Sequence, residues 1–155
     1  MTTDELPVDV LTELGRVTWA AIKLEDYAKS ICSFIQPSNP REDRRQISQK
    51  LKDATDVLKG WPDSSPRDQA AAWLQRAGQA LERRNAMLHA TPMVPVAKDG
   101  SLGPLFLGEM PRKNAPYTER ALTVESLAKL RSVLQGAASG WRDLILAVGG
   151  YTRRR

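Results

Sequence analysis

The chain is poor in cysteine, in histidine and in long apolar runs, and each shortage excludes a class of protein. Cys32 is the only cysteine among 155 residues, so no disulfide and no cysteine-rich metal cluster can form within one chain. His89 is the only histidine, and we therefore expect no zinc site and no other metal or cofactor. No stretch reaches the roughly 18 consecutive apolar residues that a membrane span needs. The first residues also lack the basic and then apolar order of a signal peptide, which predicts a cytoplasmic protein without a membrane partner.

The remaining composition is that of an ordinary folded protein. Hydrophobic residues make up 41% and charged residues 26% of the chain, which argues against a wholly disordered protein. The length fits a single domain over residues 1–155. Lysine and arginine number 23 against 18 aspartates and glutamates, a formal net charge of +5. This balance favours an anionic partner without amounting to a dense basic tract.

Apolar residues recur at steps of three and four in four stretches, the spacing that places them on one face of a helix. Proline or glycine follows the first, second and last stretches, and Ser65 with Pro66 is a typical start for the third. Amphipathic helices bury their apolar faces against one another, so we predict an all-α fold, a bundle of about four main helices. The helices are expected over residues 10–35, 47–61, 65–88 and 123–148.

A long insertion, residues 91–122, separates the third and fourth predicted helices. It exceeds the roughly 12 to 15 residues of an ordinary structureless loop. Apolar residues at 93–96 and 105–107 flank a turn signal at Asp99 and Gly100, which favours a short two-stranded ribbon packed on the helices.

The third helix carries an arginine on its apolar face. The spacing that runs through Leu74, Ala77 and Leu81 next reaches Arg84 and then Leu88. A buried charge without a partner is costly. Arg84 must therefore extend to solvent, find an anionic partner or line a cavity, and only the last of these is a functional role.

His89 follows at the expected end of this helix. At 100° per residue, Arg84 and His89 point about 140° apart, whereas Asn85 and His89 share a face. Asn85 can therefore orient the imidazole. Arg84 and His89 can line opposite walls of one cleft, above all where two copies of this helix meet.

Residues 84–89 read Arg-Asn-Ala-Met-Leu-His, which resembles the signature of the HEPN superfamily of helical nucleic-acid-processing proteins: arginine, a polar residue that is often asparagine, a short spacer and histidine. The arrangement is similar as well, with a long first helix containing Trp19 and Glu25, and the motif late in an internal helix. Beyond the motif little of the chain matches specifically.

The resemblance implies a metal-independent endoribonuclease that cleaves RNA through the ribose 2′-hydroxyl as a homodimer, with Arg84 and His89 of both subunits in a shared groove. Histidine titrates near neutrality and can exchange protons with the sugar hydroxyl and the leaving oxygen. The arginine fork can hold the scissile phosphate, and Asn85 would hold the geometry. A toxin or antiviral defence protein, with an antitoxin or other partner protein, is the role that the resemblance implies.

Other interpretations remain open for each residue. His89 can be an ordinary cation at a helix C-terminus, and Arg84 an ordinary surface-reaching side chain. The chain as a whole can be a non-catalytic helical module that binds RNA or a partner protein. A basic cluster is another candidate for phosphate binding, although such groups are most often solvated; its members are Arg41, Arg44, Arg45, Lys50 and Lys52.

Overall fold

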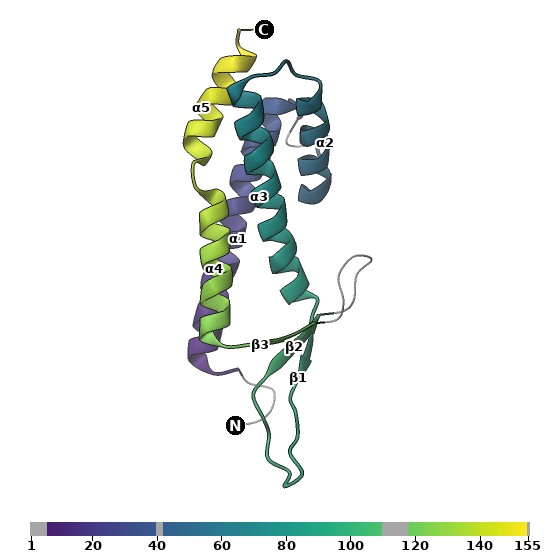
Figure 1. The fold of residues 1–155 in the computed structure, drawn as a ribbon, viewed down its shortest axis with the longest axis vertical. Coiled ribbons are helices and arrows are strands. Elements are labelled where there is room, and N and C mark those ends of the chain that lie inside the picture. Colours follow the sequence, from purple (N-terminus) through teal and green to yellow (C-terminus); the bar gives the residue numbers. More distant parts are fainter. Residues whose placement is uncertain (1–5, 40–41, 110–117, 155) are drawn as a thin grey trace.

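A computed structural model describes residues 6–39, 42–109 and 118–154. It is an elongated helical bundle with a small antiparallel sheet at one end (Figure 1). The all-α bundle with a strand-containing insertion is therefore confirmed. The elements are α1 (Val8–Ile35), α2 (Ile47–Lys59), α3 (Ser65–Leu88), β1 (Thr91–Met93), β2 (Phe106–Glu109), β3 (Thr118–Ala121), α4 (Val124–Ala138) and α5 (Trp141–Thr152).

Helix α1 runs along the whole bundle and contacts each of the other four helices. Its inner face is fully buried at Val17, Leu24, Ala28 and Ile31. Burying one such aliphatic side chain contributes about 1.5–3 kcal/mol. The helix ends at Ile35, before Pro37 as expected, because proline disfavours helical conformation in the residue that precedes it.

Helix α3 begins one residue away from the expected cap. Ser64, and not Ser65, is the N-cap, and its hydroxyl accepts the backbone N–H of Arg67 at 3.4 Å. Pro66 consequently occupies the second helical position. Trp73 is buried on this helix and donates its indole N–H to the Ser139 carbonyl at 3.1 Å, which ties α3 to the junction after α4.

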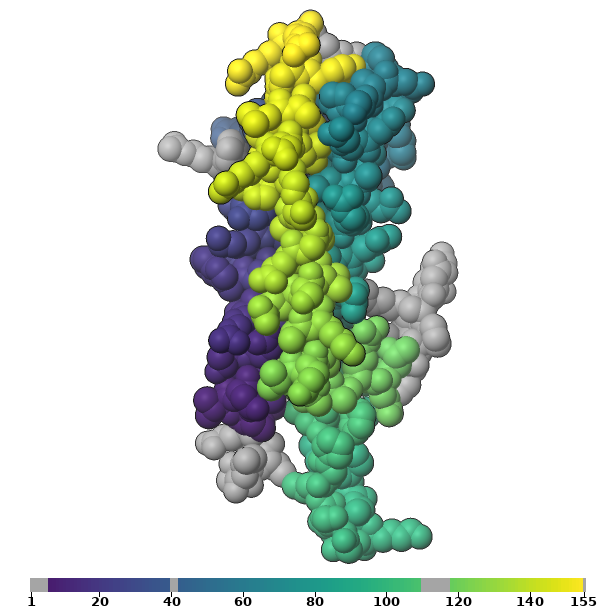
Figure 2. Space-filling view, turned by 60° about the vertical axis from the view of Figure 1, so that its left-hand side comes forward, coloured from purple at the N-terminus to yellow at the C-terminus, as the bar shows by residue number. Residues whose placement is uncertain are grey.

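The predicted helix over 123–148 is two helices. Gly140 has φ +77° and ends α4 before α5 begins, a left-handed conformation that residues with a Cβ adopt at a cost. The second part also continues through Gly149 and Gly150 to Thr152. Figure 2 shows α4 and α5 end to end along one side of the molecule.

The insertion contains three strands where two were expected. β1 and β2 form the predicted antiparallel hairpin, and its turn contains Gly100 at φ +83°. β3 adds a third strand, with Leu107 opposite Arg120. The far part of the hairpin extends past the bundle, and Val96 there is 65% exposed, so the ribbon is not packed on the helices along its length. Residues 110–117 lie outside the described part of the chain.

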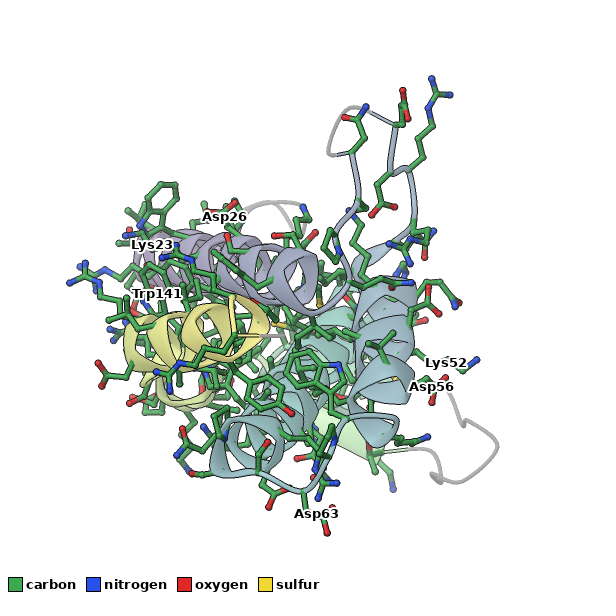
Figure 3. The ribbon with its side chains drawn as sticks, turned by 90° about the horizontal axis from the view of Figure 1, so that it is seen from above. Lys23, Asp26, Lys52, Asp56, Asp63 and Trp141 are labelled. Atoms are coloured by element: carbon green, nitrogen blue, oxygen red, sulfur yellow. The ribbon has the colours of Figure 1, made fainter. Side chains whose placement is uncertain are left out.

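Charged side chains lie on the outer sides of α1 and α2. Seen from above, Lys23 and Asp26 lie on the outer side of α1, and Lys52 and Asp56 on the outer side of α2 (Figure 3). Within the described residues, none of the helices has the length and hydropathy to cross a membrane.

Candidate functional site

The last turns of α3 leave the core and carry the Arg84–His89 motif. The buried residues of α3 end at Leu81. Leu88 is 56% exposed, so the expectation that it continues the buried stripe is wrong. Met87, one position earlier, packs partly against the core. The motif therefore lies where α3 passes from the bundle interior to its surface.

Arg84 has found an anionic partner on α1. Its Nη2 lies 3.4 Å from Oε2 of Glu25, and the Arg84 side chain is 20% exposed. Glu25 also pairs with Lys29 at 3.1 Å, so one carboxylate serves two cations. Of the three outcomes open to Arg84, the structure has the second, an anionic partner. The cavity beside this helix is lined by Arg83 and not by Arg84.

The pairing of Arg84 is incomplete. Its Nε atom is buried and has no hydrogen-bond partner in the described part of the chain. A buried donor without an acceptor costs about 1–3 kcal/mol. Among the described residues, Arg84 therefore holds an unpaired buried donor next to a long contact with Glu25.

Asn85 and His89 are not joined through their side chains. The backbone N–H of His89 donates to the Asn85 carbonyl at 3.0 Å. The described residues show no hydrogen bond between their side chains, and none between either one and Arg84. His89 is the C-cap of α3 and its side chain is exposed, while Asn85 is half-buried. Within one chain, Arg84 faces the α1 side and His89 faces solvent, so a single copy does not assemble the three groups around one point.

Two members of the basic cluster after α1, Arg45 and Lys50, are paired with acidic neighbours. Arg45 forms paired hydrogen bonds to Asp43 at 2.9 and 2.8 Å and also contacts Asp53, and Lys50 lies 3.4 Å from Asp43. The hydrogen bonds from Arg45 hold the pKa of Asp43 well below its usual value. This network fixes the segment between α1 and α2. Arg44 and Lys52 are exposed, and Arg41 lies outside the described residues.

Glu13 is a buried charge that the apolar spacing did not predict. The Glu13 carboxylate is 3% exposed and accepts hydrogen bonds from Arg131 of α4 and, at 3.1 Å, from Arg16. Burial raises the pKa of Glu13, but the hydrogen bonds from the two arginines outweigh it, so that the pKa is lowered. A signal was present: Glu13 lies three residues after Val10 and four before Val17, on the buried face of α1.

The outer face of α1 exposes apolar residues in a line. Leu11, Trp19 and Ile22 are 48%, 61% and 50% exposed, and the surface is hollowed on both sides of Trp19. Gly15 lies one turn from Trp19, and a Cβ added there would meet nothing within 4 Å. By contrast, Trp141 stacks on Tyr27 with ring centroids 4.1 Å apart. We call Leu11, Gly15, Trp19 and Ile22 the α1 stripe.

The Cys32 thiol is buried. Burial raises the pKa of the Cys32 thiol to about 11, which disfavours the reactive thiolate. Within residues 6–39, 42–109 and 118–154, no group of three or more His, Cys, Asp or Glu side chains is placed to hold a metal ion.

Comparison with family models, with curated proteins and with solved structures finds no match for this chain.

Proposed function

We propose that the chain is a HEPN-type endoribonuclease that cleaves RNA through the 2′-hydroxyl without a metal ion, acting as a homodimer. The observation that carries the proposal is the placement of the motif. An exposed imidazole ends α3, five residues after an arginine whose buried Nε has no partner among the described residues. The type of reaction is taken from the resemblance of residues 84–89 to the HEPN signature. A toxin or defence role in the cytoplasm, with an antitoxin or similar partner, follows from the resemblance alone.

The proposed reaction uses the imidazole of His89 and the guanidinium of Arg84. His89 takes the proton of a ribose 2′-hydroxyl, the 2′-oxygen attacks the adjacent phosphorus, and the bond to the 5′-oxygen breaks. That oxygen receives a proton, from the second copy's imidazole or from water, and the other product ends in a 2′,3′-cyclic phosphate. Arg84 exchanges its long contact to Glu25 for the phosphate oxygens and stabilises the charge that develops on them.

The α1 stripe is the surface on which we place the second copy. In this arrangement the two α1 helices pair antiparallel, about a centre between Gly15 and Trp19. Each Trp19 indole then lies over Gly15 of the other copy. The same pairing sets each Leu11 within one residue of the level of Ile22 of the second copy. The stripe is thus complementary to itself, as a two-fold interface requires.

A shared site requires that this pairing bring the two motifs to one face of the dimer. The two-fold axis is perpendicular to the plane of the two α1 helices, so the two α3 helices lie at equal heights along the axis, on opposite sides of it. α3 runs opposite to α1 (Figure 1), and Arg84 pairs with Glu25. His89, about 7 Å further along α3 at 1.5 Å per residue, then lies near the level of Trp19. The proposal requires both imidazoles to border a groove that forms over the α1 pair.

The interface is tested by sedimentation velocity on the wild type, Trp19→Ala and Leu146→Ala. Leu146 is 75% exposed on α5 and serves as a matched exposed apolar control. We expect a dimer for the wild type and for Leu146→Ala, and a monomer for Trp19→Ala. A monomeric wild type, or a dimer that survives Trp19→Ala, contradicts the interface.

The reaction is tested by incubating RNA with the purified chain in excess chelator and analysing the product ends. We expect 2′,3′-cyclic phosphate ends. General acid–base catalysis contributes about 10²- to 10⁴-fold, so His89→Ala should lower the rate by at least a hundredfold. His89→Ala with wild-type activity, or cleavage that requires a divalent ion, rejects the proposal.

The alternative is a non-catalytic helical module that binds RNA or a protein. The Arg84–Glu25 pair favours it, because the guanidinium already has a structural partner, and the exposed α1 stripe suits a protein partner. This alternative predicts binding without cleavage. RNA binding would weaken steeply with salt, whereas an apolar protein contact would not.

A further inference from the structure

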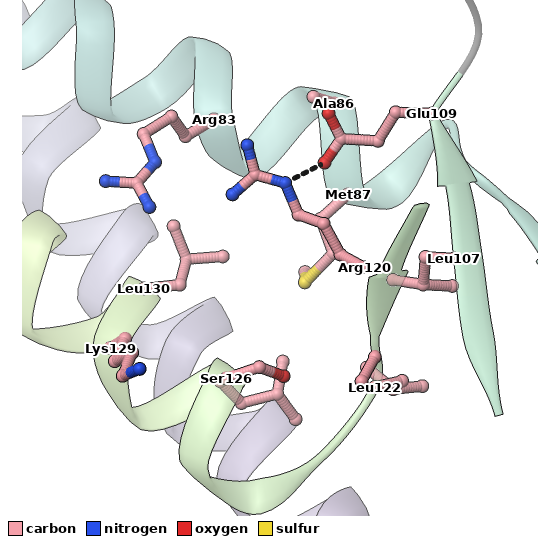
Figure 4. A pocket seen from close by; sticks show the side chains of 12 residues that line it. Arg83, Ala86, Met87, Leu107, Glu109, Arg120, Leu122, Ser126, Lys129 and Leu130 are labelled. Atoms are coloured by element: carbon pink, nitrogen blue, oxygen red, sulfur yellow. Dashed lines mark ion pairs between the residues drawn. The ribbon is translucent and has the colours of Figure 1, made fainter. Parts of the chain in front are cut away.

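A cavity of about 350 Å³ lies between α3, α4 and the sheet, and it is lined by Ala86 and Met87 of the 84–89 segment but not by Arg84 or His89. Figure 4 shows the side chains that surround it. Its walls are mainly aliphatic, and this volume falls within the range of small-molecule sites, about 300–1,000 Å³. The aliphatic lining residues are Ala86, Met87, Leu107, Leu122, Leu127 and Leu130.

Two cations border this cavity and have no side-chain partner among the described residues. Arg83 and Lys129 are both exposed, and neither forms an ion pair or side-chain hydrogen bond with any other described residue. The third cation, Arg120, is paired with Glu109 at 3.0 Å, the one ion pair drawn in Figure 4. The rim therefore keeps two positive charges that an anion can neutralise.

The uncharged polar group of the wall is already used. The Ser126 hydroxyl accepts the backbone N–H of Thr123 at 3.0 Å and donates to the Thr123 carbonyl at 3.0 Å, as part of the cap of α4. The cavity thus offers aliphatic contact inside and positive charge at the rim. A nucleobase, with its hydrogen-bonding edge, would leave polar groups unpaired against these walls.

We propose that this cavity binds a single-chain aliphatic carboxylate, with its chain against Met87, Leu107 and Leu130 and its carboxylate between Arg83 and Lys129. A water-sized group takes about 30 Å³, so the volume accommodates about a dozen heavy atoms, the size of decanoate. The proposal does not depend on ribonuclease activity.

Titration calorimetry of the full chain with monomeric decanoate tests the site. We expect one decanoate per chain and no saturable binding of decylammonium, whose charge the rim repels. Decanol should bind at least tenfold more weakly than decanoate, because a charged hydrogen bond contributes about 1.5–3 kcal/mol. Equal binding of decanol and decanoate, or many weak decanoate sites, overturns the proposal.

Matched variants locate the binding. Lys129→Gln should weaken decanoate about tenfold, whereas Lys52→Gln, an exposed lysine on α2, should leave it unchanged. Ala86→Phe should fill the cavity and abolish binding, whereas Ala72→Phe places the same ring on an exposed position of α3. Circular dichroism confirms that each variant is folded. Decanoate binding that survives both Lys129→Gln and Ala86→Phe contradicts the assignment.

Discussion

Replacing Arg84 with methionine separates a structural arginine from a functional one. Methionine keeps the length and apolar stem but removes the charge. The lost contact to Glu25 is a single 3.4 Å pair between side chains 20% and 26% exposed, and such partly exposed pairs contribute less than about 1 kcal/mol. Removing the buried Nε that lacks a partner gains back about 1–3 kcal/mol. Arg84→Met should therefore change the free energy of unfolding by no more than about 1 kcal/mol in the unfavourable direction, and it can stabilise the protein.

The reverse substitution behaves differently. Glu25→Gln leaves Arg84 with its charge and without a carboxylate, and a partly buried charge that loses its partner is costly. We expect Glu25→Gln to destabilise the protein more than Arg84→Met does. Urea unfolding, followed by tryptophan fluorescence at equal m-value, measures both. In the RNA assay, Arg84→Met should nevertheless be nearly inactive, because one electrostatic donor is worth about 10²- to 10³-fold in rate.

The refuting result is a loss of more than 2 kcal/mol in Arg84→Met. The guanidinium would then be required by the fold, and its place on the apolar face would need no functional explanation. An Arg84→Met variant with wild-type stability and wild-type RNA cleavage would instead remove Arg84 from the reaction.

Three further predictions concern the fold. Because the pKa of Glu13 is lowered, its contribution to stability is present at pH values above the ordinary pKa of 4.5 and is lost as the pH falls through the lowered pKa. Glu13→Gln should therefore flatten the acid side of a plot of the urea unfolding midpoint against pH. A plot whose acid side is unchanged from the wild type contradicts this. Gly140→Ala should destabilise the protein by about 1 kcal/mol, because φ at this residue is +77°. The matched control Gly136→Ala, inside α4, should stabilise the protein by about 0.5–1 kcal/mol. Equal effects of the two variants in urea unfolding would refute the argument. Cys32 is 5% exposed, with its pKa raised to about 11, so it should react with a thiol reagent slowly when native and rapidly in urea, and rapid native reaction would place it at the surface.

The helices were predictable because their apolar spacing is strong. The stripe from Val17 to Ile31 is buried as expected, since a continuous apolar face has one way to leave water. The break before α5 was not predictable from the spacing, because the apolar spacing continues across it through Leu134, Ala137 and Leu144. Only Gly140 marked it, and a single glycine inside a helical pattern usually just weakens the helix.

Charges within the core were harder to anticipate than the core itself. Arg84 stood out because a cation interrupted an apolar run, yet its partner Glu25 came from another helix, 59 positions away. Glu13 and Arg131 bridge 118 positions in the same way. Pairing across such separations depends on how the helices pack, which local periodicity does not encode.

The third strand shows the same limit at the sheet. The hairpin of β1 and β2 followed from the Asp99–Gly100 turn signal. β3 has only four residues, and it pairs through its backbone along β2. Short strands of mixed polarity carry little pattern of their own, so the cavity that β3 helps to close was not foreseeable.

The most direct measurement compares cleavage of one RNA with that of the same sequence carrying 2′-O-methyl groups, both in excess chelator. A site that uses the sugar hydroxyl as its nucleophile should cut the first and leave the second intact, and His89→Ala should cut neither. Cleavage of the methylated strand at a comparable rate, or an intact RNA with the dimeric wild-type protein, would contradict the account.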